Sequence, residues 1–103
     1  MEPVQDLTIK NNTEAQRFEA ELDGERAVTD YYLNNNIIIL RHTEVSPALE
    51  GRGVARKLVQ TALDEAREKG YQVMPLCPYV AGFIRKHPEY QDLVMARFKY
   101  MVI

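Results

Sequence analysis

Residues 37–76 read IIILRHTEVSPALEGRGVARKLVQTALDEAREKGYQVMPL. The apolar run at the start predicts a strand that is buried on both faces and continues to Val45. Apolar residues then recur at helical spacing, which predicts a helix over 52–69 that ends at Gly70. Residues 71–76 predict a second strand. Because a helix connects the two strands, we expect them to be parallel neighbours in a β–α–β unit.

The segments before this unit predict an antiparallel meander. Leu7–Ile9 indicates a short strand, and apolar and charged residues alternate over 17–22, as is typical of a half-exposed strand. Asp23-Gly24 predicts a hairpin turn into a strand over 27–33, and the asparagines at 34–36 predict another turn. The predicted fold class is therefore mixed α/β (α+β), with an antiparallel meander followed by the parallel unit in one sheet.

The C-terminal part predicts a second helix and a last strand. Pro78 suits the first turn of a helix, and Pro88 ends that helix. Residues 95–103 predict the last strand. A chain of 103 residues predicts one domain, spanning residues 1–103.

Composition and charge exclude several classes of protein. With 46% hydrophobic and 27% charged residues, the chain has the composition of a folded globular protein. The net charge of −2 argues against a general nucleic-acid binder, although the basic excess in residues 51–103 suits a small anionic ligand. No apolar run is long enough to span a membrane, and Met1-Glu2-Pro3 opens no signal peptide. Cys77 is the only cysteine, which predicts a reducing, cytoplasmic location.

The loop Glu50–Ala55 is the first candidate for a binding site. Its two glycines leave backbone amides uncovered at a helix N-terminus, and Arg52, Arg56 and Lys57 add positive charge. The loop therefore suits a phosphate or pyrophosphate; the alternative is a flexible helix start with solvated basic side chains. No Gly-Lys-Ser/Thr follows, and the third glycine of a dinucleotide fingerprint is missing, so neither of those motifs is present.

These residues resemble a known motif. Val45 and residues 51–58 resemble the acetyl-CoA motif of the GCN5-related N-acetyltransferases, which runs Gln/Arg-x-x-Gly-x-Gly/Ala. Gly53 and Ala55 occupy the fourth and sixth positions of that motif. Glu50 occupies the first position, where the motif has Gln or Arg. This difference weakens the expectation for the outermost pyrophosphate contact.

A narrower resemblance covers more of the chain. Residues 42–45, 51–55, 77–80 and 86–90 resemble, in this order and spacing, the small YjdJ-like subfamily. The resemblance implies a minimal acetyltransferase fold whose sheet splays at the CoA site. Residues 10–17 leave no room for the pair of N-terminal helices found in larger relatives.

The resemblance also implies a ligand and the residues that hold it. It implies acetyl-CoA as the acetyl donor and an amine, either a small molecule or a protein, as the acceptor. The backbone of Val45 would pair with pantetheine. Tyr79 would give a proton to the leaving thiolate, or else belong to the core. The pyrophosphate would be held by Gly51, Arg52, Gly53, Val54, Ala55 and Arg56.

Three side chains are candidates for the chemistry. Cys77 precedes Pro78, and a helix N-terminus there would favour a nucleophilic thiolate; the alternative is a small buried apolar side chain. The resemblance implies that Cys77 lies close to the CoA thiol and could carry the acetyl group transiently. His42 and Glu44 share one face of a strand, and either could be a general base. Their alternatives are a hydrogen-bonded imidazole and a surface carboxylate.

Two classes of function therefore stay open. The first is an acyltransferase that moves acetyl from acetyl-CoA to an amine, directly or through Cys77. The second is a CoA-binding or protein-interaction module without turnover. The sequence predicts no metal site and no nucleic-acid or membrane partner, and it does not identify the acceptor.

Overall fold

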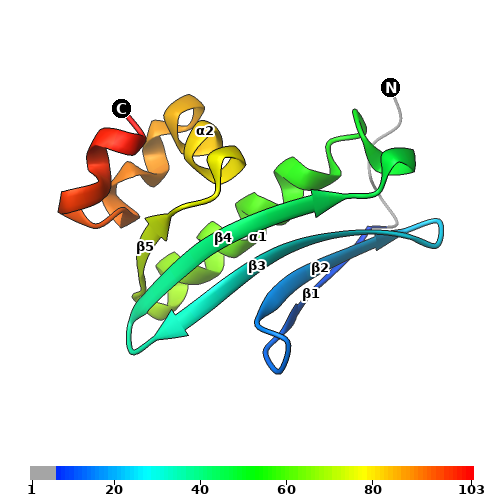
Figure 1. The fold of residues 1–103 in the computed structure, drawn as a ribbon, viewed down its shortest axis with the longest axis horizontal. Coiled ribbons are helices and arrows are strands. Elements are labelled where there is room, and N and C mark those ends of the chain that lie inside the picture. The colour runs from blue at the N-terminus through cyan, green and yellow to red at the C-terminus, as the bar shows by residue number, and fades with distance from the viewer. Residues whose placement is uncertain (1–6) are drawn as a thin grey trace.

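The computed structural model describes residues 7–103, which form a five-stranded sheet flanked by helices (Figure 1). The order of strands in the sheet is the order in the chain. The strands are β1 (Thr8–Asn12), β2 (Arg17–Leu22), β3 (Glu25–Asn34), β4 (Ile37–Val45) and β5 (Gln72–Pro75). The pairs from β1 to β4 are antiparallel and β4 pairs with β5 in parallel, which confirms the predicted mixed sheet.

The helices all come after β4 in the chain, and β5 lies between α1 and α2. They are η1 (Pro47–Leu49), α1 (Val54–Lys69), α2 (Pro78–Lys86), η2 (Pro88–Leu93) and η3 (Ala96–Met101), and the η segments are 3₁₀. The helix α1 begins two residues later than predicted because Gly53 adopts a left-handed φ of 80°. It ends as predicted at Gly70, whose φ is 74° and whose amide bonds to carbonyls of the last turn.

The core lies between the sheet and the helices, and α1 runs along one face of the sheet (Figure 1). This arrangement corrects the prediction that residues 37–40 are buried on both faces. Ile38 and Leu40 are buried on the covered face, whereas Ile37 and Ile39 are only half-buried. The opposite face, called here the outer face, stays partly exposed because no helix formed by residues 7–103 covers it.

A β-bulge interrupts β4. Two successive residues of β3 pair with Leu40 and His42, so Arg41 has no partner on β3. An extra residue of this kind shifts the alternation of side chains by one. Leu40 therefore faces the core before the bulge, and Thr43 faces the covered side after it, while His42 turns to the outer face.

The prediction of a last strand over 95–103 is wrong. Residues Ala96–Met101 form η3, and only Val94 bridges to Val73 of β5. The strand β5 is four residues long and ends at Pro75, which has no N–H to donate. Its free edge therefore supports a single bridge rather than a ladder, and the chain turns into a 3₁₀ helix.

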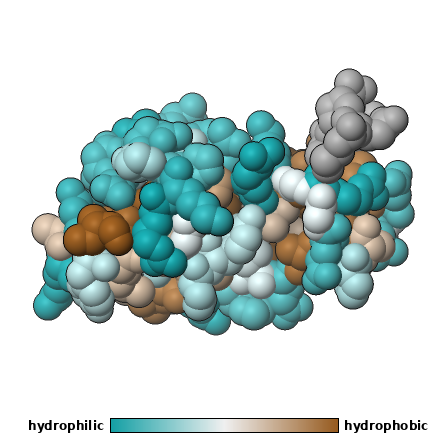
Figure 2. Space-filling view, turned by 90° about the horizontal axis from the view of Figure 1, so that it is seen from above, coloured by the Kyte–Doolittle hydropathy of each residue, from teal (hydrophilic) through white to brown (hydrophobic). Residues whose placement is uncertain are grey.

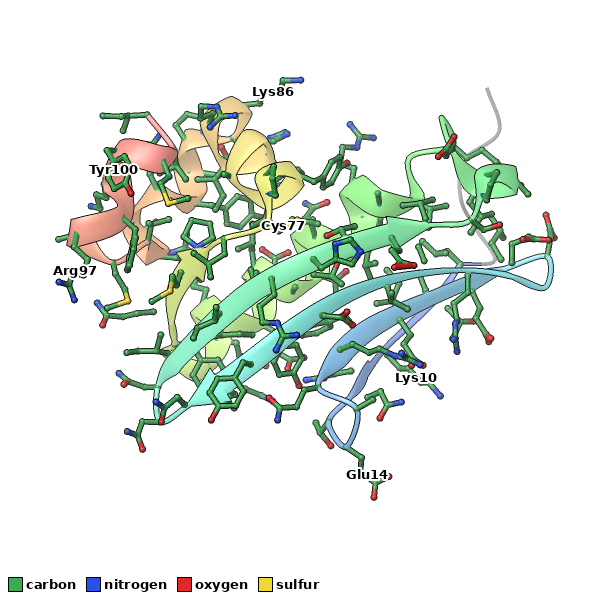
Figure 3. The ribbon with its side chains drawn as sticks, in the orientation of Figure 1. Lys10, Glu14, Cys77, Lys86, Arg97 and Tyr100 are labelled. Atoms are coloured by element: carbon green, nitrogen blue, oxygen red, sulfur yellow. The ribbon has the colours of Figure 1, made fainter. Side chains whose placement is uncertain are left out.

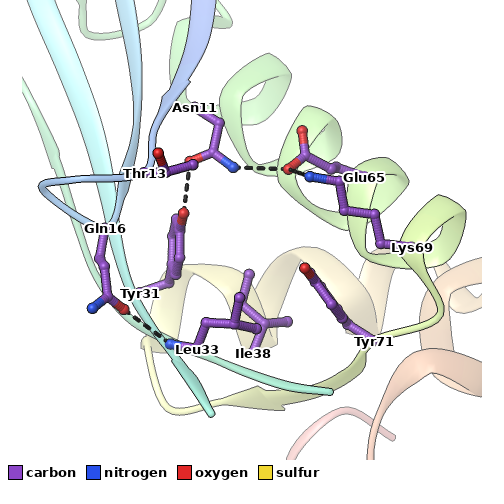
Figure 4. Close-up of a pocket in the computed structure, with 9 residues that line it drawn as sticks. All are labelled: Asn11, Thr13, Gln16, Tyr31, Leu33, Ile38, Glu65, Lys69 and Tyr71. Atoms are coloured by element: carbon purple, nitrogen blue, oxygen red, sulfur yellow. Dashed lines mark hydrogen bonds and ion pairs between the residues drawn. The ribbon is translucent and has the colours of Figure 1, made fainter. Parts of the chain in front are cut away.

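A polar network ties the first hairpin to the C-terminal half of α1 (Figure 4). The Tyr31 hydroxyl donates to Asn11 Oδ1 at 2.7 Å, and Asn11 Nδ2 donates to Glu65 Oε2 at 2.8 Å. Lys69 Nζ lies 3.1 Å from the same Glu65 oxygen. These groups border a cavity of about 280 Å³. Because the polar groups satisfy one another, we interpret the network as structural.

Candidate functional site

The strands β4 and β5 separate after Leu40. The whole of β5 pairs with the first four residues of β4, and the Cys77 amide then donates to the Leu40 carbonyl at 2.9 Å. Beyond this point β4 continues to Val45 without β5 beside it. The Ser46 amide bonds back to β3 at 3.0 Å, and successive amides of a strand point in opposite directions. The Val45 amide therefore faces the edge that β5 has left.

This opening forms a cleft of about 490 Å³, called here the splay cleft. Its walls come from the end of β4, the loop that follows, the start of α1 and the first turn of α2. The lining residues are Thr43, Val45, Leu49, Glu50, Gly51, Gly53, Val54, Ala55, Arg56 and Tyr79.

Two glycines shape the loop at the mouth of the splay cleft. Gly51 and Gly53 have φ values of 78° and 80°, which strain any residue with a Cβ. A Cβ on Gly51 would meet no atom within 4 Å, so a side chain there would project into open space. The first hydrogen bond of α1 runs from the Lys57 amide to the Gly53 carbonyl, at 3.1 Å. The amides of residues 54–56 therefore have no helical acceptor and suit a phosphate.

The charges around the loop favour an anion. The first turn of α1 carries Arg56 and Lys57 and no acidic residue, although positive side chains there oppose the helix dipole. A bound anion would offset that cost, and Arg56 lines the cleft. Arg52 does not line it: its guanidinium lies 3.5 Å from the Asp23 carboxylate in the β2–β3 turn. Glu50 is the acidic residue of the lining.

Cys77 lies at the point where the strands separate, between β5 and α2 (Figure 3). It is the N-cap residue of α2, as predicted, and only 3% of its surface is exposed. Its Sγ lies 3.4 Å from Oγ1 of Thr43, which lines the splay cleft. The thiol therefore lies behind Thr43, whose side chain forms the cleft wall at this point. Sequence reasoning missed Thr43, because only the bulge turns this residue toward the covered face.

Tyr79 extends from the first turn of α2 into the splay cleft, with 44% of its surface exposed. Burial of the phenol raises the pKa of Tyr79, and the positive charge of Arg56 acts in the opposite direction. The hydroxyl group is therefore protonated at neutral pH and can donate a proton.

His42 and Glu44 do share one face of β4, with Nε2 and Oε1 3.1 Å apart. The bulge places them on the outer face, and neither lines the splay cleft. The structure therefore brings Cys77 together with Thr43 and not with His42 or Glu44. No signal in the sequence marks the bulge that separates these residues.

Parallel strands that separate beside a glycine loop and a helix N-terminus match the fold class of the N-acetyltransferases. The sequence model described as GCN5-related N-acetyl-transferase matches residues 17–93. The chain belongs to this family, and its fold is a minimal version of the family's mixed sheet. The narrower YjdJ-like resemblance stays a prediction.

Several known proteins are similar to this chain. The Protein NATD1 of Bos taurus is 33% identical over 85 residues, which cover 80% of this chain and 75% of that protein. The Protein NATD1 of Xenopus tropicalis is 30% identical over 91 residues, covering 85% of this chain and 84% of its own length. The solution structure of a GCN5-like protein from Staphylococcus aureus matches with a TM-score of 0.65 and 28% identity, over 87% of this chain and 89% of that chain.

Residues 7–103 lack the features of two other kinds of site. None of the helices described there has the length and apolar character needed to cross a membrane. The same residues contain no group of three or more His, Cys, Asp or Glu side chains placed to hold a metal ion.

Proposed function

We propose that this protein transfers an acetyl group from acetyl-CoA to an amine. Family membership supports acetyl transfer in general, and acetyl-CoA is the donor that the family implies. The observation that carries the proposal is the splay cleft, where free amides and Arg56 meet the open edge of β4. This arrangement suits a ligand with an anionic pyrophosphate and an amide-containing arm.

The residues of the splay cleft would divide the work of binding. The amides of residues 54–56 and the guanidinium of Arg56 would hold the pyrophosphate. The backbone of Val45 would pair with the pantetheine amides as a strand would. This pairing directs the thioester along β4 toward Thr43 and Cys77, at the closed end where the strands part.

Two chemical routes are consistent with this placement. In the two-step route, the Cys77 thiolate attacks the thioester carbonyl carbon, the bond to the CoA sulfur breaks, and Tyr79 gives its proton to that sulfur. The amine then attacks the acetyl-cysteine, the Cys77 thiolate leaves, and the proton lost by the amine returns to Tyr79. In the direct route, the amine attacks the thioester itself. His42 or Glu44 would then take its proton from the outer side of β4.

Calorimetry with CoA and acetyl-CoA tests the binding half of the proposal. Gly51→Glu places a carboxylate in open space at the loop and should abolish binding. Gly24→Glu is the matched control, because Gly24 also has a φ of 78° and no atom within 4 Å of an added Cβ. Gly24 lies in the β2–β3 turn, so this variant should carry similar strain and bind normally. If the Gly51→Glu variant bound CoA and acetyl-CoA as tightly as the parent protein, the proposed binding site would be wrong.

Release of free CoA in the presence of amines and peptides tests the transfer half. We expect acceptor-dependent release by the parent protein and none by the Gly51→Glu variant. Tight binding of acetyl-CoA without release for any acceptor would favour the alternative, a CoA-binding or protein-interaction module without turnover.

A further inference from the structure

Three side chains form a series of hydrogen bonds that begins in the core and ends at the thiol of Cys77. Thr29 of β3 and Thr43 of β4 are partners across the two strands, and their Oγ1 atoms lie 3.1 Å apart. Thr43 Oγ1 lies in turn 3.4 Å from Cys77 Sγ, where α2 begins (Figure 3). We call these three side chains the thiol network. Of the three, only Thr43 lines the splay cleft.

The thiol network lies inside the molecule. The surface seen from above α2 is mostly hydrophilic (Figure 2), whereas 0% of Thr29 and 3% of Cys77 are exposed. Among residues 7–103, the Thr43 hydroxyl is the one hydrogen-bond partner of the Thr29 hydroxyl. Because a buried hydroxyl proton without an acceptor is costly, Thr29 donates its proton to Thr43 Oγ1.

This direction of donation also orients the Thr43 hydroxyl. Since Thr43 Oγ1 accepts the proton of Thr29, its own proton points away from Thr29, and the Cys77 sulfur is its next partner. A donor held at a sulfur stabilises the thiolate more than the thiol. Without Thr29, the Thr43 hydroxyl can turn and accept the proton of the thiol, which favours the neutral form.

We infer that Thr29 is a positioning residue that turns the Thr43 hydroxyl to donate to the Cys77 sulfur. The inference rests on the proposed function, because the two-step route starts from the Cys77 thiolate, formed when the thiol proton passes to solvent. The same donated bond stabilises the sulfur again when the amine displaces it from the acetyl group. Thr29 does not line the splay cleft, so its effect passes through Thr43.

The charged groups around the thiol stay in place when the threonines are changed. The β5 strand carries no titratable side chain, and the titratable residues of β4 past the bulge lie on the outer face. The titratable and charged side chains from the other surrounding elements are Tyr79, Arg56, Glu50 and Tyr31. A change in the titration of Cys77 in a threonine variant therefore reports on the thiol network.

The pH dependence of Cys77 alkylation by iodoacetamide tests the inference. Cys77 is the only cysteine, so intact mass spectrometry follows this thiol alone. Thr43→Val should slow alkylation at neutral pH by about tenfold, the effect of one hydrogen bond to a charged atom, and raise the pH at which the rate is half-maximal. Thr29→Val should shift the rate profile in the same direction. Thr29→Ser keeps the hydroxyl and should restore the parent profile.

Thr61→Val is the matched control. The Thr61 hydroxyl donates to the Lys57 carbonyl within α1, outside the splay cleft, so this variant should keep the parent profile. A threonine with a purely structural role would change the rate by the same factor at every pH. That result for Thr29→Val, or a profile equal to that of the parent, would overturn the inference.

Two outcomes separate the inference from the proposed function. If acetyl-CoA binds and amines are acetylated while Thr29→Val keeps the parent profile, the inference fails and the proposed function stands. If the profile shifts but acetyl-CoA does not bind, the proposed function fails and the role of Thr29 at the thiol stands. A parent thiol that resists iodoacetamide at every pH would also overturn the inference, because acetyl-CoA is the larger reagent.

Discussion

The Cys77 sulfur touches the Thr43 hydroxyl at 3.4 Å and is almost fully buried. Acetylation of this sulfur therefore requires a small displacement of the wall that Thr43 forms. We expect acetyl-CoA to add one acetyl group to the parent protein and none to Cys77→Ala, measured by intact mass spectrometry. Cys77→Ser keeps the shape of the side chain but is a poor nucleophile, so it should transfer acetyl to amines much more slowly.

The rate of the cysteine variants decides between the two routes. If Cys77→Ala and Cys77→Ser acetylate an amine as fast as the parent, the thiol is structural. His42→Ala and Glu44→Gln should then slow the reaction, because the direct route needs a base on the outer side of β4.

Arg52 and Arg56 form a natural pair for a test of charge. Both are near the glycine loop, but only Arg56 lines the splay cleft, whereas Arg52 pairs with Asp23. Arg56→Gln should weaken CoA binding by a few-fold, in line with about 0.2–1 kcal/mol for an exposed contact. The loss should shrink as salt is added, because salt screens exposed charges. Arg52→Gln should change the affinity less, and a larger effect of Arg52→Gln would show that the loop reorganises on binding.

At the scale of elements, the bulge at Arg41 has the greatest consequence for the site. Without it, the alternation set by Ile38 and Leu40 would continue to His42 and Glu44, and these two would face the covered side. With it, Thr43 and Val45 take that position. One extra residue in β4 thus decides which side chains meet the ligand and which face outward.

The network between the first hairpin and α1 predicts a stability effect without a binding effect. Asn11→Ala removes the acceptor of the Tyr31 hydroxyl, and Tyr31 is buried. We expect the free energy of unfolding to fall by about 1–3 kcal/mol, the usual cost of an unsatisfied buried polar group. Urea denaturation measures this loss. CoA affinity should not change, because Glu65 lies toward the far end of α1 from the loop.

Thr13→Ala is the control for this variant. Thr13 borders the same cavity, but its side chain is exposed and makes no hydrogen bond with the described residues. If Asn11→Ala destabilises the protein no more than Thr13→Ala does, water replaces the Asn11 contacts and the network is not a structural tie.

At the scale of the whole molecule, two carboxylates link stability to pH. Glu19 accepts hydrogen bonds from Arg17 and Asn12 on the outer face, and the bond from Arg17 is the main cause of its lowered pKa. The hydrogen bond from Arg67 likewise lowers the pKa of Asp92, which joins η2 to α1. A carboxylate whose pKa is lowered in the folded state stabilises the protein at pH values above its unfolded pKa. This stabilisation is lost as the pH falls through the folded pKa.

The stabilising effect should therefore disappear on the acid side. The ordinary pKa values are 4.5 for Glu19 and 3.8 for Asp92, so the free energy of unfolding should fall as pH drops through and below these values. Urea denaturation from about pH 7 to about pH 3 measures the slope. Glu19→Gln should make the slope shallower, and an unchanged slope would show that Glu19 titrates alike in both states.

Most of the elements could be predicted from the sequence because their signals are local. The spacing of apolar residues in α1, the left-handed Gly70 at its end, and Pro78 at the start of α2 each act within a few residues. The parallel pairing of β4 with β5 also follows from local order, because a helix joins them. The glycine loop could also be predicted from local sequence, because the first amides of any helix lack helical acceptors.

The remaining features depend on residues that are distant in the chain. The bulge lies where β4 pairs with Asp30 and Tyr31 of β3, and no pattern within β4 reveals it. The pairing of Arg52 with Asp23, the contact of Cys77 with Thr43 and the single bridge of β5 each join separate segments. Sequence periodicity therefore determined the elements and the loop. Tertiary packing decided which side chains face the cleft, because side-chain direction in a sheet is set by strand pairing.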